Sequence, residues 1–203
     1  VSAICSAENI QVETEKLKTI VDTNATKLWS KEIWNKSLEI YNAILKHKFI
    51  DELSFGTLSD EIFGRYIAQD EIYLKNYYHQ MNMLAELMES SEDKELFLAF
   101  AKSGMEGEKA MHDMLIDLYG IETKVEPSKV TSDYNAHICE GIATGNPCIA
   151  LAAVLPCMWI YNQVGLYILN HSKLEGNPYK EWILEYGQEE FTAGVDQVLK
   201  MID

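Results

Sequence analysis

A near-continuous apolar run extends from Pro147 to Asn170 and has the length of a long helix. Cys157 and Tyr161 lie four residues apart within it, so on a helix they share one face. Pro156 directly precedes the cysteine, removes one backbone hydrogen bond and crowds the carbonyl of Ala152. The pattern therefore predicts a helix with a kink beside the thiol.

This run is long enough to raise the question of a membrane span. Pro156, Asn162 and Gly165 interrupt it, and no cluster of Lys or Arg flanks it. We therefore predict a buried helix that passes through the middle of a soluble protein.

Apolar residues at helical spacing recur along the rest of the chain, and no stretch alternates as a β-strand does. The class predicted is all-α, with seven or eight helices and no internal repeat. Ser59 is the expected N-cap of one long helix, and Gly120 is the expected end of the next. We interpret residues 47–59 as a punctuated link. The other expected helices cover about 8–21, 28–45, 60–88, 94–119, 131–144 and the part after Asn177, which Gly187 divides.

The 203 residues fit one large domain, with a flexible lead at residues 1–8 and a single all-α domain over residues 9–203. A hydrophobic fraction of 47% and a charged fraction of 24% are typical of a globular protein. The formal net charge of −15 argues against nucleic-acid binding, which needs a basic stripe, and against anionic membrane surfaces.

The four cysteines show no CxxC or zinc-site spacing, and three of them lie in apolar helical surroundings. Free thiols of this kind suit a reducing compartment, so we predict a cytoplasmic protein. The first residues, VSAICSAEN, are small and apolar enough to be the tail of a processed export signal. Export is therefore the alternative, if residues 1–8 are such a tail.

All-α bundles often hold a ligand between facing helices, in a pocket lined by aromatic rings and a few polar groups. A thiol beside a kink is a candidate for such a pocket, and as a nucleophile it needs a proton acceptor or a positive neighbour. Taken by itself, a cysteine on an apolar helix is more often a core residue. The pair Asp70 and Tyr73 is likewise more often a solvated acid beside a core aromatic ring.

Metal chemistry is the competing possibility in a helical bundle. Glu108 and His112 form an E-x-x-x-H pair, which superficially resembles the ligands of a carboxylate-bridged di-iron site. Such a site needs a second matching cluster, and no other histidine supplies one. We therefore expect no metal site and interpret Glu108 and His112 as a pair on a helix surface.

Three motifs resemble those of the TenA (thiaminase II) family. HKFIDELSFGTLSDEIFGRYIAQDEIYLKNY resembles its opening signature, in which His-Pro-Phe precedes a GTL turn and a helix bearing Q-D-x-x-Y-L. AAVLPCMWIYNQVG resembles its L-P-C-x-W-x-Y helix, and EWILEYGQEEF resembles its W-x-x-x-Y-G segment. The motifs occur in the family's order, over about residues 27–203.

The resemblance implies a heme-oxygenase-like all-α bundle without heme or other cofactor, usually assembled as a homotetramer. It implies hydrolysis of 4-amino-5-aminomethyl-2-methylpyrimidine to the hydroxymethyl pyrimidine in thiamin salvage, and cleavage of thiamin as well. Cys157 then matches the nucleophile, and Asp70 matches the carboxylate that binds the aminopyrimidine and orients the thiol. A carboxylate raises the pKa of a nearby thiol, so Asp70 is better a proton acceptor or orienter than a thiolate stabiliser. The aromatic wall of the pocket is matched by Tyr73, Tyr134, Tyr161 and Tyr186.

Two departures from the family's pattern remain. Lys48 stands where a proline usually follows His47. The family's last helix carries a glutamate that acts as general acid and base, whereas this chain ends at Asp203, and neither Glu189 nor Glu190 matches that position. The alternatives are therefore a catalytically impaired pyrimidine-binding relative, and a di-metal oxidase on the same scaffold. The sequence does not distinguish thiamin from its breakdown product as the preferred substrate.

Overall fold

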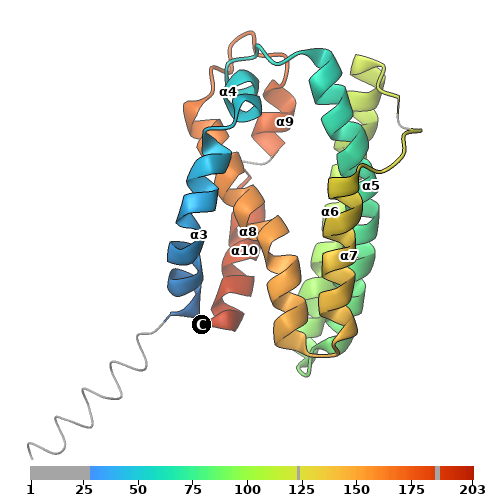
Figure 1. The fold of residues 1–203 in the computed structure, drawn as a ribbon, viewed down its shortest axis with the longest axis vertical. Coiled ribbons are helices and arrows are strands. Elements are labelled where there is room, and N and C mark those ends of the chain that lie inside the picture. Colours follow the sequence, from blue (N-terminus) through green and yellow to red (C-terminus); the bar gives the residue numbers. More distant parts are fainter. Residues whose placement is uncertain (1–27, 123, 186–187) are drawn as a thin grey trace, which may run out of the picture. The chain divides into compact units, whose positions relative to one another are not determined.

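A computed structural model describes residues 28–122, 124–185 and 188–203, and these residues form helices and no strand (Figure 1). The predicted all-α class is confirmed. The expected lead at residues 1–8 and the expected helix over 8–21 lie outside the described residues. The helices are α3 (Trp29–Leu45), α4 (Lys48–Ser54), α5 (Asp60–Leu87), α6 (Ser91–Tyr119), α7 (Lys129–Ala143), α8 (Pro147–His171), α9 (Lys180–Glu185) and α10 (Glu189–Ile202).

The chain divides into two compact units, and the division falls inside α3 and α10. In the smaller unit, the Asp203 carboxylate accepts hydrogen bonds from the backbone N–H and the hydroxyl of Ser30, both at 2.8 Å. The larger unit, Leu45–Val195, contains the long helices and the cavity described below. The expected single domain over residues 9–203 stays a prediction.

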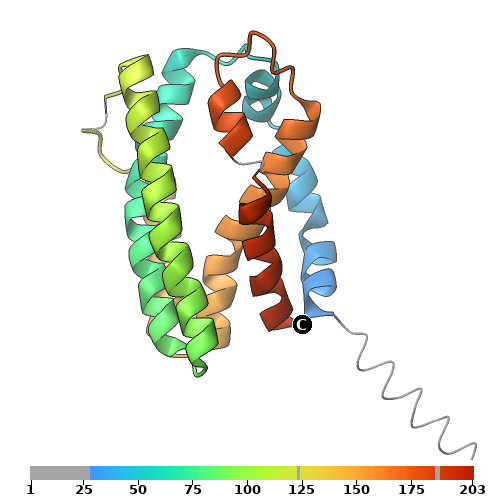
Figure 2. The same ribbon diagram turned by 180° about the vertical axis from the view of Figure 1, so that it is seen from behind.

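The helical hairpin of α5 and α6 is defined by the end signals that the sequence contains. The hydroxyl of Ser59 accepts from the N–H of Ile62 at 3.4 Å, and that of Ser90 accepts from Asp93 at 3.0 Å. Helix α6 ends at Gly120, which adopts the left-handed conformation at φ 61°. The two helices lie side by side in Figures 1 and 2, and α7 packs against α5 and α8.

The structure differs from the prediction in one additional helix and in one helix boundary. The segment interpreted as a link contains the short helix α4, whose N-cap is His47, with Nδ1 accepting from the N–H of Phe49 at 3.2 Å. Seven residues are too few to establish a helical period in sequence. Helix α7 begins at Lys129, because Ser128 caps it by accepting from the N–H of Thr131 at 3.1 Å. The expected start at residue 131 is therefore two residues late.

Helix α8 is the apolar run, and it continues as one element through Pro156. Asn146 caps it, and Pro147 occupies its first turn, where a missing N–H costs nothing. Within the described ranges it is the one helix whose length and composition would allow it to cross a membrane. Its most apolar window is 50% buried inside the structure, and core helices of soluble proteins meet the same criterion, so a membrane span is only weakly indicated.

The segment before α9 is fixed to the end of α4 by buried hydrogen bonds. The side-chain amide of Asn177 donates to the carbonyls of Leu53 and Ser54 at 3.0 and 3.1 Å. The hydroxyl of Tyr179, a fully buried residue, donates to the carbonyl of Leu58 at 2.6 Å. These bonds hold the start of α9 against the core, and the last residue of α9, Glu185, lines the cavity.

Replacement of Gly56 by alanine should lower the free energy of unfolding by about 1–3 kcal/mol. Gly56 has φ +67°, and a Cβ there would lie 3.0 Å from Pro178 Cδ and 3.2 Å from the Cα of Asn177. Gly120→Ala is the matched control, because Gly120 also has a positive φ but open space around a Cβ. Urea denaturation should therefore show a larger loss for Gly56→Ala; equal losses would contradict the steric argument.

Candidate active site

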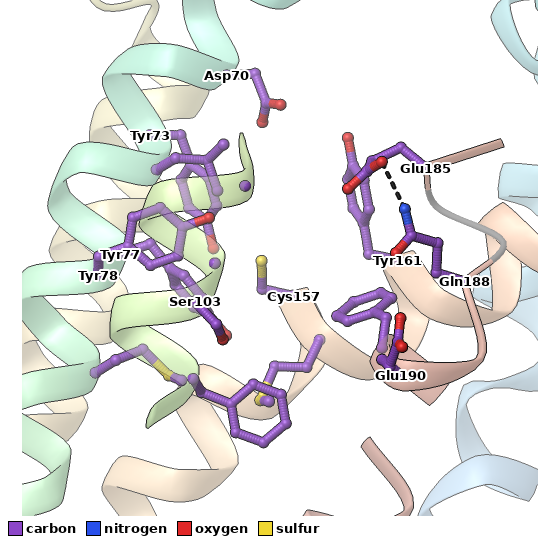
Figure 3. A pocket seen from close by; sticks show the side chains of 17 residues that line it. Asp70, Tyr73, Tyr77, Tyr78, Ser103, Cys157, Tyr161, Glu185, Gln188 and Glu190 are labelled. Atoms are coloured by element: carbon purple, nitrogen blue, oxygen red, sulfur yellow. Dashed lines mark hydrogen bonds between the residues drawn. The ribbon is translucent and has the colours of Figure 1, made fainter. Parts of the chain in front are cut away.

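A cavity of about 270 Å³ lies within the larger unit, between α5, α6, α8 and the segment from α9 to α10 (Figure 3). Its lining combines aromatic rings with a thiol, a few hydroxyls and three carboxylates. The lining residues are Asp70, Tyr73, Leu74, Tyr77, Tyr78, Met81, Phe100, Ser103, Gly104, Gly107, Cys157, Met158, Tyr161, Glu185, Gln188, Glu190 and Phe191.

The thiol of Cys157 points into this cavity from α8. Figure 3 shows the sulfur between Tyr73 on one side and Tyr161 on the other. Cys157 is half-buried, so the thiol is accessible from the cavity while its helix remains packed. Tyr161 follows one helical turn later and lines the same cavity, as their spacing of four residues predicts.

Tyrosine hydroxyls with raised pKa values surround the thiol. Burial raises the pKa of Tyr73 and of Tyr77, and the neighbouring Cys157 raises both further. Burial, followed by the effect of Cys157, also raises the pKa of Tyr134 to about 12. These phenols are therefore neutral near pH 7 and cannot act as bases there.

The tyrosines stack into an ordered wall behind the thiol. Tyr134 stacks on Tyr73 with ring centroids 5.2 Å apart and planes 8° apart, and Tyr73 stacks on Tyr77 at 5.5 Å and 25°. The Tyr77 hydroxyl donates to the carbonyl of Val154 at 3.3 Å, which ties the wall to α8 one turn before the cysteine. On α6, Gly104 leaves room for Tyr78, since a Cβ at Gly104 would lie 2.7 Å from that ring.

One buried hydroxyl of the wall is a candidate for contact with a ligand. Tyr73 lines the cavity and is only 9% exposed. Its hydroxyl oxygen meets no atom with hydrogen-bond geometry in the part of the chain that the structure describes. The thiol of Cys157 and the ring of Tyr134 are its neighbours, and the cavity gives a ligand access to the same hydroxyl.

Asp70 brings a carboxylate to the cavity from α5. Its Oδ2 accepts from the hydroxyl of Tyr66 at 3.4 Å and lies 3.5 Å from Nε2 of His112. His112 is 3% exposed, so the expectation that it belongs to a surface pair is wrong. Sequence spacing shows which residues share a helix face, but not whether that face turns toward another helix. Here the face of α6 that carries His112 turns toward α5, and the His112 ring lies against the Asp70 carboxylate.

The structure brings together most of the residues predicted for the site. Cys157, Asp70, Tyr73 and Tyr161 line one cavity, whereas Tyr134 lies behind Tyr73 and is not a lining residue. Tyr186 lies outside the described residues, so its place in the wall stays a prediction.

Several lining residues are not among those predicted from the sequence. Tyr77 and Glu185 are the most informative of them. Tyr77 follows Tyr73 at a helical spacing of four, and Glu185 directly precedes Tyr186 in the W-x-x-x-Y-G segment, so both positions carried a signal. Among the described residues, no group of three or more His, Cys, Asp or Glu side chains is arranged to hold a metal ion.

The chain is similar to a known family and to characterised proteins. The model of the TENA/THI-4/PQQC family matches residues 31–203. A thiamine biosynthesis multifunctional protein, ThiED, of Corynebacterium efficiens is 31% identical over 86% of this chain and 24% of its own length. An aminopyrimidine aminohydrolase of Bacillus subtilis is 27% identical over 86% of this chain and 75% of its own. The chain thus spans about a quarter of the first relative and three quarters of the second.

Solved structures share the fold. A TenA homologue from P. horikoshii OT3 superimposes with a TM-score of 0.77 at 27% identity, covering 86% of this chain and 84% of that one. A TenA homologue from Pyrococcus furiosus gives a TM-score of 0.79 at 21% identity, covering 85% and 82%. At that lower identity the likeness concerns the fold alone.

Proposed function

This chain belongs to the TENA/THI-4/PQQC family, and we propose that it hydrolyses 4-amino-5-aminomethyl-2-methylpyrimidine to the hydroxymethyl pyrimidine in thiamin salvage. It is an enzyme, a hydrolase of the thiaminase II type. Relatives named aminopyrimidine aminohydrolase support this assignment. The observation that carries it is the Cys157 thiol, which faces a tyrosine-lined cavity that also contains the Asp70 carboxylate.

The cavity suits a flat aminopyrimidine. An aromatic ring needs π-faces or apolar groups on both sides, and Tyr73 and Tyr161 lie on opposite sides of the thiol. An exocyclic amine needs a hydrogen-bond acceptor, which the Asp70 carboxylate supplies. The hydroxyl of Tyr66 donates to Oδ2 of this carboxylate at 3.4 Å, and Nε2 of His112 lies 3.5 Å from the same oxygen.

In the proposed reaction, the Cys157 thiol transfers its proton to an acceptor, for which Asp70 is the candidate. The thiolate adds to the unsubstituted ring carbon next to the carbon that bears the aminomethyl group. The displaced ring electrons expel the protonated amine as ammonia. Water then adds to the exocyclic methylene and releases a proton, and the thiolate departs as the ring becomes aromatic again and takes back the proton held by the acceptor. The sum is amine plus water to alcohol plus ammonia.

Other features of the family are proposed with the activity. These are cleavage of thiamin in the same cavity, a homotetramer in solution and a location in the cytoplasm. Light scattering on the purified protein tests the tetramer, and a mass of one or two chains would contradict it. The family resemblance supports the thiamin cleavage and the tetramer, and the free cysteines support the cytoplasm.

The test of the reaction is product analysis in ¹⁸O-labelled water. Hydrolysis should give one ammonia for each hydroxymethyl pyrimidine, and the new hydroxyl should carry the label. Tight binding of the pyrimidine without ammonia release would favour the impaired binding relative instead. Turnover that consumes oxygen would favour the di-metal oxidase.

A further inference from the structure

We propose that Glu185 determines specificity in this cavity by binding the positively charged substituent of the substrate. The cavity would then favour cationic aminopyrimidines over the neutral hydroxymethyl product. This inference rests on the proposed function and assigns a role to Glu185, which occupies one of the unspecified positions of the W-x-x-x-Y-G segment.

The position of Glu185 supports this role. It is the last residue of α9, it is half-buried, and its side chain lines the cavity across from Tyr73 (Figure 3). The amide Nε2 of Gln188 donates to its Oε2 at 2.6 Å, which orients the carboxylate. A carboxylate has about four acceptor positions, so this one bond leaves capacity for a ligand.

The helix that carries Glu185 is firmly packed. Trp182 and Ile183 of α9 are 4% and 1% exposed, and the segment before the helix is fixed by the buried bonds of Asn177 and Tyr179. The backbone before Glu185 is therefore held by the core, so its side chain is presented from a packed helix.

The charge of the lining favours a cation. Of the described residues that line the cavity, three are carboxylates, Asp70, Glu185 and Glu190, and none is Lys, Arg or His. Asp70 lies on α5 and Glu185 on α9, so the two carboxylates reach the ligand from different walls.

The substrate and the product differ in charge at one position. The aminomethyl group is a primary alkyl amine and is protonated at neutral pH, as a lysine side chain is. The thiazolium ring of thiamin is a permanent cation, whereas the hydroxymethyl product is neutral. A carboxylate beside this position attracts both substrates and loses that attraction when the amine leaves, which aids product release.

The test compares dissociation constants by calorimetry for the aminomethyl pyrimidine and the hydroxymethyl pyrimidine. Glu185→Gln should weaken binding of the aminomethyl compound about tenfold, because it removes a charge from a half-buried site. It should change binding of the hydroxymethyl compound by less than about twofold, since glutamine keeps the shape and still accepts from Gln188. Glu181→Gln, on the exposed face of the same helix, is the matched control and should change neither constant.

Three other outcomes would contradict the proposed role of Glu185. Equal weakening of both compounds would show that Glu185 only shapes the cavity, and unchanged binding of both would show that it has no role; either result overturns this inference alone. If the parent chain binds neither pyrimidine, both the proposed function and this inference are wrong.

Discussion

Replacement of Cys157 by alanine should reduce ammonia release from the aminomethyl pyrimidine by about 10³-fold or more. The thiol is the strongest nucleophile among the groups that line the cavity, and alanine removes it without adding bulk. The tyrosine wall and Asp70 remain, so binding of the pyrimidine should change little. Steady-state ammonia assays with a parallel binding measurement separate the two effects.

The chain contains its own controls for this prediction. Cys139 and Cys148 are exposed and lie outside the cavity lining, so replacing either by alanine should leave the rate unchanged. Cys157→Ser should be nearly as inactive as the alanine variant, because a hydroxyl is far less ionised than a thiol at pH 7. If Cys157→Ala retains a tenth of the parent rate, the covalent mechanism is wrong.

Asp70→Asn should lower kcat/KM by about 10²–10³-fold. Asparagine keeps the size of the side chain but removes the negative charge and the capacity to take a proton. The position is 9% accessible at its side chain and lies against His112 and Tyr66, so the amide cannot swing away into water. Most of the loss should appear in kcat if Asp70 handles the thiol proton, and in KM if it only binds the exocyclic amine.

Asp117→Asn is the matched control for this substitution. Asp117 lies on the exposed face of α6, and its replacement makes the same change in net charge away from the cavity. Its kcat/KM should equal that of the parent. An Asp70→Asn variant within twofold of the parent would remove Asp70 from the mechanism.

Much of the fold can be predicted from the sequence because the signals are local. The caps at Ser59 and Ser90 and the glycine at 120 fix the ends of α5 and α6 within a residue or two. Helix α4 escapes prediction because it is shorter than two helical periods and is held by contacts with the distant Asn177. Such tertiary contacts are invisible in a single sequence.

The site residues can be predicted where they belong to a sequence motif. They cannot be predicted where tertiary packing alone brings them to the cavity. Motif resemblance predicts Cys157 and Asp70 as site residues, and the structure places both in one cavity. His112 was misread because the direction of its helix face depends on the α5–α6 contact. Glu185 has only a weak sequence signal, its place beside Tyr186 in the W-x-x-x-Y-G segment, because a glutamate is most often solvated.

The most direct test of the central claim, that pyrimidine binds and reacts at Cys157, is protection of the thiol from alkylation. Iodoacetamide labelling is followed by mass spectrometry at each cysteine, with and without the hydroxymethyl pyrimidine. We expect the pyrimidine to slow labelling of Cys157 but not of the exposed Cys139 and Cys148, and ammonia release to fall in step with Cys157 labelling. The account would be contradicted if the pyrimidine left the labelling rate of Cys157 unchanged. It would also be contradicted if ammonia release continued after Cys157 was fully labelled.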